Sequence, residues 1–274
     1  MGTSANAKRG WALVTGASSG LGVEFARQLA SRGYDLVLVA RRRDKLAKVA
    51  AEISEKHGIK AEIIECDLGV PGASGTLMSV LETRAIDLEV LVNNAGFGHF
   101  GLALDAPLAQ HTATIQLNVT LLTELTLATT AKMVARGSGT VLNVASTGAF
   151  QPCPYTAVYA ATKSYVVNFS LALNNELSPR GVRVLTMCPG PTKTEFFEVN
   201  NVRAAAPDAL VMTAERCVAI GLRSMDRGRA LTITGFLNTI GVWLARSSPL
   251  WLVTRASAIL MKPRGDKRLS PRSS

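Results

Sequence analysis

The sequence TGASSGLG, residues 15–22, decides the fold class of this chain. It follows an apolar run, Trp11–Thr15, and precedes a helical pattern, and its glycines have the spacing G-x-x-x-G-x-G. Glycines in such a turn permit a tight bend, close approach of the backbone to a phosphate, and close packing of the helix. The helix N-terminus then offers free N–H groups to a pyrophosphate. The stretch predicts a nucleotide-binding turn, although taken alone it is also compatible with ordinary loop chemistry.

Apolar runs of strand length recur along the chain, with helical patterns between them. This alternation is typical of βαβ units and a parallel sheet, and the unbroken apolar run Leu36–Ala40 is typical of a strand covered on both faces. We therefore predict an α/β fold with a doubly wound, mostly parallel seven-stranded sheet and helices on both faces. The expected strands are Trp11–Thr15, Leu36–Ala40, Ala61–Cys66, Val90–Asn93, Val141–Ser146, Val182–Cys188 and Leu231–Thr234. The expected helices are Gly22–Ser31, Asp44–Lys56, Pro107–Arg136, Val158–Leu177 and Ala214–Asp226, and glycines 33, 58, 137 and 181 stand just after four of these.

The composition describes a packed globule. Hydrophobic residues make up 47% of the 274 residues and charged residues 18%, which excludes wholesale disorder. The four cysteines, at 66, 153, 188 and 217, form no C-x-x-C pair, so we expect neither a metal site nor a disulfide framework. The first residues lack the apolar core of a signal peptide. These features favour a cytoplasmic protein.

The C-terminal segment differs from the rest of the chain. Beyond residue 245, seven basic residues face one acidic residue, which accounts for +6 of the net charge of +10. Two apolar stretches, 236–245 and 250–261, are each shorter than the ~20 residues that span a membrane. We expect a packed or interfacial pair of helices, with either peripheral membrane contact or subunit packing as the reason. Nucleic-acid binding has no recognised motif behind it, so we predict no nucleic-acid partner.

Three arginines, Arg41–Arg43, follow the second expected strand. A dinucleotide site that selects NAD normally has an acid there to bind the ribose 2′-hydroxyl, and none is present. A guanidinium suits a 2′-phosphate, and positive charge is otherwise unfavourable at a helix N-terminus. We predict NADP(H) as the cofactor, with Arg41 as its main contact, Arg42 second and Ser18 assisting.

The strongest chemical signal lies between Ser146 and Lys163. Ser146 ends the fifth expected strand, and Tyr159 and Lys163 stand four residues apart at the start of a helix, on one face. A phenol with a pKa of ~10 is a poor acid or base at neutral pH until a nearby cation stabilises its phenolate. Lys163 would supply that charge. A carbonyl oxygen held between the Ser146 and Tyr159 hydroxyls would be polarised for hydride attack, with Tyr159 giving the proton.

Three other residues have side chains that could take part by residue type. Tyr155 competes with Tyr159 but lies two turns from Lys163, and we expect it to contact the substrate. His99 and His111 have no carboxylate partner nearby in sequence, and we expect them to be structural.

Read together, these residues resemble the classical short-chain dehydrogenase/reductase family. The resemblance covers roughly Gly10 to Gly190 and joins, in family order, Thr15–Gly22, Asp67, Asn93–Gly96, Asn118, Ser146, Tyr159-x-x-x-Lys163 and Pro189-Gly190. It implies a Rossmann sheet, a nicotinamide cofactor and a Ser-Tyr-Lys centre, in a homodimer or homotetramer. Ser18 stands where some NADP enzymes of the family have a second basic residue, so selectivity depends mainly on Arg41.

The resemblance also implies a set of site residues. The catalytic residues would be Ser146, Tyr159, Lys163 and Asn118, the last of which would maintain a water-linked proton relay to Lys163. The implied cofactor contacts are Gly16, Ser18, Ser19, Gly20, Leu21, Gly22, Arg41, Arg42, Asp67, Leu68, Asn94, Ala95, Gly96, Tyr159, Lys163, Pro189, Gly190, Thr192 and Thr194. Substrate would contact Ser146, Tyr155 and Tyr159. Asp67, judged without this context, is more simply the cap of a turn.

We expect one domain, 1–274, with a substrate lid at about 191–229 and an extension at about 236–274. Apolar residues in the lid and extension favour a ketone or aldehyde on a largely apolar molecule, such as an acyl chain or a steroid-like ring, although core or interface packing would also explain them. These residues are Phe196, Phe197, Val199, Leu210, Val211, Met212, Phe236, Leu237, Trp243, Leu250 and Trp251. The alternative function is a catalytically silent NADP(H)-binding scaffold, against which the complete Ser146, Tyr159 and Lys163 set argues.

Overall fold

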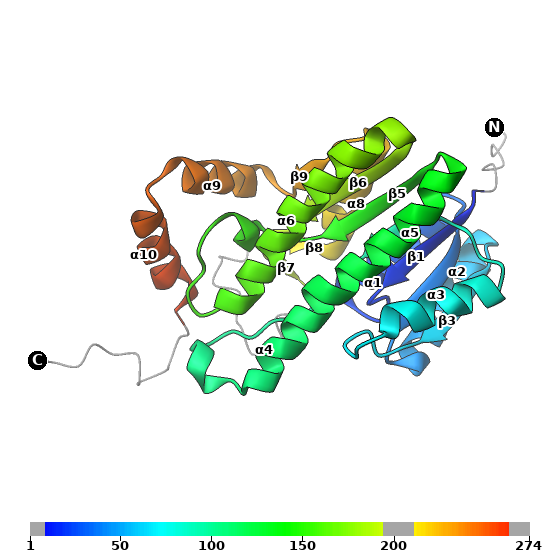
Figure 1. Ribbon diagram of the computed structural model, residues 1–274, viewed down its shortest axis with the longest axis horizontal. Helices are drawn as coiled ribbons and strands as arrows, with labels where there is room; N and C mark the ends of the chain where they lie inside the picture. Colours follow the sequence, from blue (N-terminus) through cyan, green and yellow to red (C-terminus); the bar gives the residue numbers. More distant parts are fainter. Residues whose placement is uncertain (1–8, 194–210, 263–274) are drawn as a thin grey trace, which may run out of the picture.

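A seven-stranded parallel sheet forms the centre of the computed structural model, which describes residues 9–193 and 211–262 (Figure 1). The strand order is β3-β2-β1-β4-β5-β6-β9. The strands are β1 (Trp11–Thr15), β2 (Asp35–Ala40), β3 (Ala61–Glu65), β4 (Leu88–Asn93), β5 (Gly139–Val144), β6 (Val182–Cys188) and β9 (Leu231–Ile233). This sheet confirms the predicted fold class. The order reverses between β1 and β4, and ligands of such sheets bind at that switch point, beyond the carboxyl ends of the strands.

Helices cover both faces of the sheet, and each face has its own core. The helices α1 (Gly20–Ala30), α2 (Arg43–His57) and α8 (Ala214–Asp226) pack on one face. The helices α3 (Ala73–Thr83), α5 (Leu122–Arg136) and α6 (Ala157–Leu177) pack on the other. Strand β2 shows the division, because Leu36 and Leu38 enter the first core while Val37 and Val39 enter the second.

The four glycines expected near helix ends all have positive φ. At the ends of α2 and α5, Gly58 and Gly137 have φ values of 66° and 76°, and a Cβ at either position would meet nothing within 4 Å. The left-handed backbone conformation, not crowding, is therefore what favours glycine there.

Two helix predictions need correction. The single helix expected over Pro107–Arg136 is divided into α4 (Leu108–Ile115), a π-helical turn η2 (Gln116–Leu121) and α5. The hydrophobic pattern of this segment predicts a helix, but it does not show where a single wider turn interrupts that helix. The helix α3 was not predicted, because small polar residues and Gly75 interrupt the apolar pattern formed by Leu77 and Leu81.

The C-terminal segment forms the expected pair of helices, α9 (Phe236–Ser247) and α10 (Leu250–Met261). They project beyond the sheet at the end of the molecule opposite α2 and β3 (Figure 1). Across residues 9–193 and 211–262, none of the helices combines the length and apolarity that crossing a membrane would require. A second, two-stranded parallel sheet pairs β7 (Thr192–Lys193) with β8 (Met212–Thr213).

Candidate active site

The glycine turn after β1 forms a cradle with the N-terminus of α1. Gly16 and Gly20 have φ values of 67° and 54°. A Cβ built at Gly22 would lie 2.1 Å from the carbonyl oxygen of Gly16, so only glycine lets α1 begin this close to the turn. Ser19 caps the helix in an extended conformation without a side-chain bond to it. The cradle fits a pyrophosphate group at the first turn of α1.

Thr15 holds this turn against the end of β4. Its Oγ1 accepts hydrogen bonds from the backbone N–H groups of Asn94 at 2.9 Å and Ala95 at 3.0 Å. In return, Asn94 Nδ2 donates to the carbonyl oxygen of Thr15 at 2.9 Å. Thr15 was not among the predicted contacts. Its place as the polar last residue of an apolar strand is the sequence signal that could have identified it.

Arg42 and Ser18 are brought together at the start of α2. Nε and Nη2 of Arg42 donate to Ser18 Oγ at 3.3 and 3.2 Å. Arg41, the predicted main contact, lies exposed just before this helix. Asp67 is exposed, and its Oδ1 accepts a hydrogen bond from the Gly69 N–H at 2.9 Å, which is the turn-capping geometry considered for it. Its predicted cofactor contact, and that of its buried neighbour Leu68, stay predictions.

Ser146, Tyr159 and Lys163 meet beyond the carboxyl end of β5. Ser146 Oγ accepts a hydrogen bond from the Gly148 N–H at 3.2 Å and is also hydrogen-bonded to Tyr159. Lys163 is 4% exposed, and its Nζ lies 5.7 Å from the centre of the Tyr159 ring. It donates to the carbonyl oxygen of Val144 at 2.8 Å. The spacing of four residues therefore places the ammonium group beside the phenol, as predicted.

Burial sets the electrostatics of this cluster. It raises the pKa of Tyr159 to about 12, and the hydrogen bond from Ser146 opposes that rise. Burial also lowers the pKa of Lys163 to about 8, against a small opposing effect of Cys188. At neutral pH the phenol therefore holds its proton while the neighbouring ammonium is still largely charged.

Asn118 lies near Lys163, on the other side of Gly96, and is fully buried in the π-helical turn. Its Nδ2 donates to the carbonyl oxygen of Phe97 at 2.9 Å and to Thr162 Oγ1 at 3.1 Å, and its Oδ1 accepts from the Phe97 N–H at 3.2 Å. A Cβ at Gly96 would lie 3.0 Å from that Oδ1 and 3.3 Å from Lys163 Nζ. The Gly96 position thus leaves space between the two side chains.

Lys163→Met should remove a pH-dependent penalty of about 3 kcal/mol that the buried cation imposes on the folded state at pH 7, and it also removes the hydrogen bond to the Val144 carbonyl oxygen. Lys163 has a folded pKa of about 8 and an unfolded pKa near 10.5, so below pH 8 both states hold the proton and the folded state carries the full desolvation penalty. Between these values the unfolded state binds more protons, and the stability of the wild type rises with pH. Urea unfolding at several pH values should show that the unfolding free energy of the variant, relative to that of the wild type, falls above pH 8. A difference that stays constant across this range contradicts the prediction.

Tyr155 and the two histidines line a separate small cavity of about 20 Å³. The rings of His99 and His111 meet edge to face with centroids 5.7 Å apart, and His111 Nε2 lies 2.8 Å from the carbonyl oxygen of Ala103. Tyr155 has a φ of 66°, and its carbonyl oxygen accepts a hydrogen bond from the Gly101 N–H at 2.8 Å. The substrate contact of Tyr155 and the structural role of the histidines stay predictions.

The segment after β6 lies beside the site, where the carbonyl oxygen of Pro189 accepts a hydrogen bond from the Thr147 N–H at 2.9 Å. Thr192 is buried, and its Oγ1 donates to the carbonyl oxygen of Gly190 at 2.9 Å. A Cβ at Gly190 would lie 2.1 Å from Asn238 Nδ2, so this segment packs directly on α9. That contact was not predicted, because it joins positions far apart in sequence. Thr194, Phe196, Phe197, Val199 and Leu210 lie outside the described residues.

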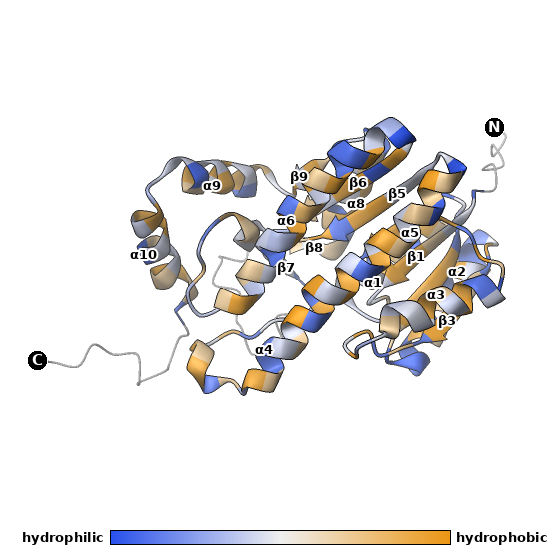
Figure 2. Cartoon of the chain, viewed as in Figure 1, coloured by the Kyte–Doolittle hydropathy of each residue, from blue (hydrophilic) through white to orange (hydrophobic). Residues whose placement is uncertain are grey.

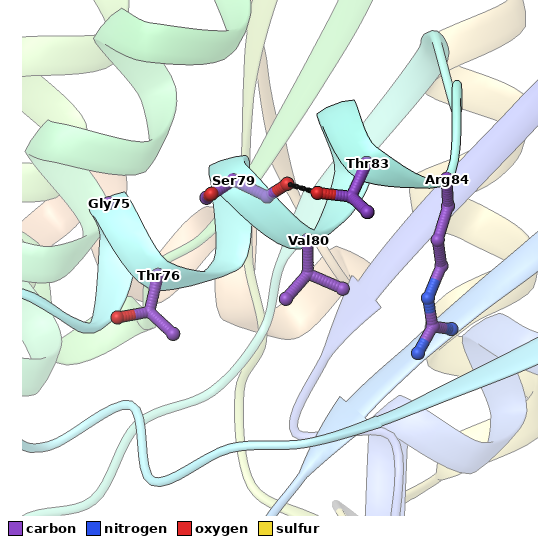
Figure 3. Close-up of a pocket in the computed structure, with 6 residues that line it drawn as sticks. All are labelled: Gly75, Thr76, Ser79, Val80, Thr83 and Arg84. Carbon is purple, nitrogen blue, oxygen red and sulfur yellow. Dashed lines mark hydrogen bonds between the residues drawn. The ribbon is translucent and has the colours of Figure 1, made fainter.

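A wider hollow lies elsewhere, along the outer side of α3 (Figure 3). Its lining includes Thr76, Ser79 and Thr83, whose Oγ1 donates to the Ser79 carbonyl oxygen at 2.9 Å. Its one charged side chain, Arg84, pairs with Glu62 at 2.7 Å. The lining of the hollow therefore contains no counterpart of the buried tyrosine and lysine of the Tyr159 cluster.

Comparison with known proteins agrees with this geometry. The family model described as short chain dehydrogenase matches residues 10–204. The chain belongs to the short-chain dehydrogenase family. It is accordingly an oxidoreductase with a nicotinamide cofactor, which argues against the silent-scaffold alternative.

Individual members of the short-chain dehydrogenase family are moderately similar to the chain. A very-long-chain 3-oxoacyl-CoA reductase of Pyrenophora tritici-repentis is 32% identical over 232 residues, which cover 82% of this chain and 67% of that protein. A short-chain dehydrogenase from Sphingobium yanoikuyae, solved in complex with NADPH, aligns with a TM-score of 0.79 and 30% identity over 94% of this chain and 98% of its own. A 7β-hydroxysteroid dehydrogenase aligns with a TM-score of 0.82 and 27% identity, covering 92% and 97%.

Proposed function

We propose that this short-chain dehydrogenase reduces a ketone on a long apolar molecule with NADPH, and that its substrate is a 3-oxoacyl thioester or a similar lipid. The observation that carries the proposal is the cluster of Ser146, Tyr159 and Lys163 beyond β5. The substrate class is supported by the 3-oxoacyl-CoA reductase and the hydroxysteroid dehydrogenase among its relatives. Their names specify a very-long-chain 3-oxoacyl thioester for the first and a hydroxysteroid for the second.

The roles follow from the geometry of the cluster. The hydroxyls of Ser146 and Tyr159 are hydrogen-bonded to each other and together bind the carbonyl oxygen of the substrate. Tyr159 then gives its proton to that oxygen, and the Lys163 ammonium stabilises the phenolate that remains. Asn118 holds the segment at Phe97 against Thr162, next to Lys163. The bound nicotinamide supplies the hydride.

Cofactor selection is assigned to the two arginines that directly precede α2, Arg41 and Arg42. Ser18 holds the Arg42 guanidinium near the glycine cradle, and Arg41 extends the positive charge at the same helix terminus. Charge-assisted bonds from these side chains to a 2′-phosphate favour NADPH over NADH.

Arg41→Ala and Arg42→Ala should each raise the KM for NADPH by about 10-fold or more, with little change in the KM for NADH. The reason is that NADH has no 2′-phosphate to bind. Steady-state kinetics with both cofactors measures the effect, and Arg43→Ala, at the next position along α2, is the matched control. Equal losses with the two cofactors would contradict the assignment.

The experiment that tests the function is NADPH oxidation against 3-oxoacyl thioesters and other ketones graded in chain length and polarity. We expect turnover to increase with the apolar length of the substrate. Turnover of small polar sugars or polyols alone would overturn the proposal.

The wider organisation is proposed on the same basis. We propose one domain over residues 1–274, with a lid at about 191–229 that selects the substrate. We also propose a cytoplasmic homodimer or homotetramer that makes peripheral contact with a membrane through its C-terminal extension. Size-exclusion chromatography with light scattering tests the subunit number.

A further inference from the structure

The helix α9 has two unlike faces. Asn238 and Val242 form its buried face, with Val242 only 7% exposed. This face packs on the 3-10 turn η3 (Thr147–Phe150), which directly follows Ser146, and on Gly190. Ser146 and the segment at Gly190 therefore lie on the inner side of α9.

The outer faces of α9 and α10 carry large apolar residues. On α9 these residues recur at intervals of one, three or four positions, which places them on one helical face. On α10 the buried positions are Val253 and Ser257, while larger side chains face outward. Figure 2 shows hydrophobic residues along both helices. The exposed set is Phe236, Leu237, Ile240, Trp243, Leu244, Leu250, Trp251, Leu252, Ile259 and Leu260, with Trp243 and Trp251 66% and 62% exposed. We call this set the hairpin face.

The charged residues within the hairpin segment itself have one sign. Residues 231–262 contain no acidic side chain, and they contain Arg246, Arg255 and Lys262. The guanidinium of Arg255 lies 5.5 Å from the ring of Trp251. The sequence beyond residue 262 adds four basic residues and one acidic residue. Two copies of this face would bring like charges together, whereas an anionic lipid surface complements both its apolar residues and its charge.

We propose that the hairpin face lies in the surface of an anionic bilayer, and that the apolar substrate enters the catalytic centre from that bilayer. The substrate part of this inference rests on the function proposed above. The α9 helix separates the hairpin face from η3, which directly follows Ser146, and a helix with its side chains is about 10 Å thick. An acyl chain can therefore remain largely in lipid while its ketone reaches Ser146 and Tyr159.

The test uses the full chain, with the double variant Trp243→Glu/Trp251→Glu and the control Leu104→Glu/Leu108→Glu. The control residues are apolar, 98% and 80% exposed, and lie outside the hairpin. Flotation is measured with phosphatidylcholine vesicles, with and without phosphatidylglycerol. NADPH oxidation is measured with a short, water-soluble 3-oxoacyl thioester and with a long-chain one dissolved in the same vesicles.

We expect the wild type and the control to float with the phosphatidylglycerol vesicles only, and the tryptophan variant to remain in solution. The tryptophan variant should lose about 10-fold or more of kcat/KM for the long-chain substrate and keep its rate with the short one. Flotation of the tryptophan variant overturns the proposal, and so does an unchanged long-chain rate or a dimer that only this variant loses. Absence of turnover with both substrates in the wild type refutes the proposed function instead, while flotation still decides the bilayer contact.

Discussion

Tyr159→Phe should lower kcat for ketone reduction by about 10³-fold while leaving the Kd for NADPH nearly unchanged. The variant keeps the ring that packs against Gly98 and Phe100 and removes only the hydroxyl that gives the proton. A positioned general acid typically contributes 10²- to 10⁴-fold to a rate, which sets the size of the loss. NADPH oxidation measures kcat, and the change in NADPH fluorescence on binding measures Kd.

The matched control for this variant is Tyr165→Phe. Tyr165 lies on the same helix, and its hydroxyl is 2.9 Å from Thr123 Oγ1, away from the Ser146 cluster. Its loss should leave kcat within about 2-fold of the wild type. If Tyr159→Phe stays within about 10-fold of the wild type, the proton has another donor. If both variants lose activity equally, the loss is not specific to the Tyr159 hydroxyl.

Gly22→Ala should weaken NADPH binding by about 100-fold and destabilise the protein by roughly 1–3 kcal/mol. The added methyl group would lie 2.1 Å from the Gly16 carbonyl oxygen and 2.9 Å from Asn94 Nδ2, so α1 or the cradle must move. Either movement separates the first N–H groups of α1 from the position of the pyrophosphate. A fluorescence titration and urea unfolding measure the two effects.

Gly75→Ala provides the comparison, because a Cβ there meets nothing within 4 Å and the residue lies inside α3. Alanine favours a helix over glycine, so this variant should be as stable as the wild type or slightly more stable. NADPH binding at wild-type strength by Gly22→Ala would show that the cradle does not hold the cofactor.

The parts of the fold that the sequence predicts are those in which neighbouring residues carry the signal. The unbroken run that became β2 and the glycine turn before α1 are local patterns, and both were confirmed. The meeting of Ser146 with Tyr159 was predictable because both follow one strand, and a spacing of four brings Lys163 to the same face.

The remaining features depend on packing between distant segments. The contact of Asn238 with Gly190 and the bonds from Asn118 to Phe97 and Thr162 join separate elements. Nothing in the pattern around either residue specifies its partner. The pairing of Arg42 with Ser18 is of the same kind, and the sequence alone ranked Arg41 ahead of Arg42.

The π-helical turn at Gln116–Leu121 makes the number of residues in this segment structurally important. Such a turn holds one residue more than an α-helical turn, and one residue corresponds to about 100° of rotation. A deletion of a single residue here would let the chain close as a regular α-helix while α4 keeps nearly the same face toward its neighbours, because the wide turn had absorbed the rotation of the extra residue. Thr114, 1% exposed, would keep its packing site, whereas Asn118 would lose the wide turn in which it lies. Among relatives of this protein, a one-residue alignment gap at this place should therefore mark a regular helix here, whatever the overall sequence identity.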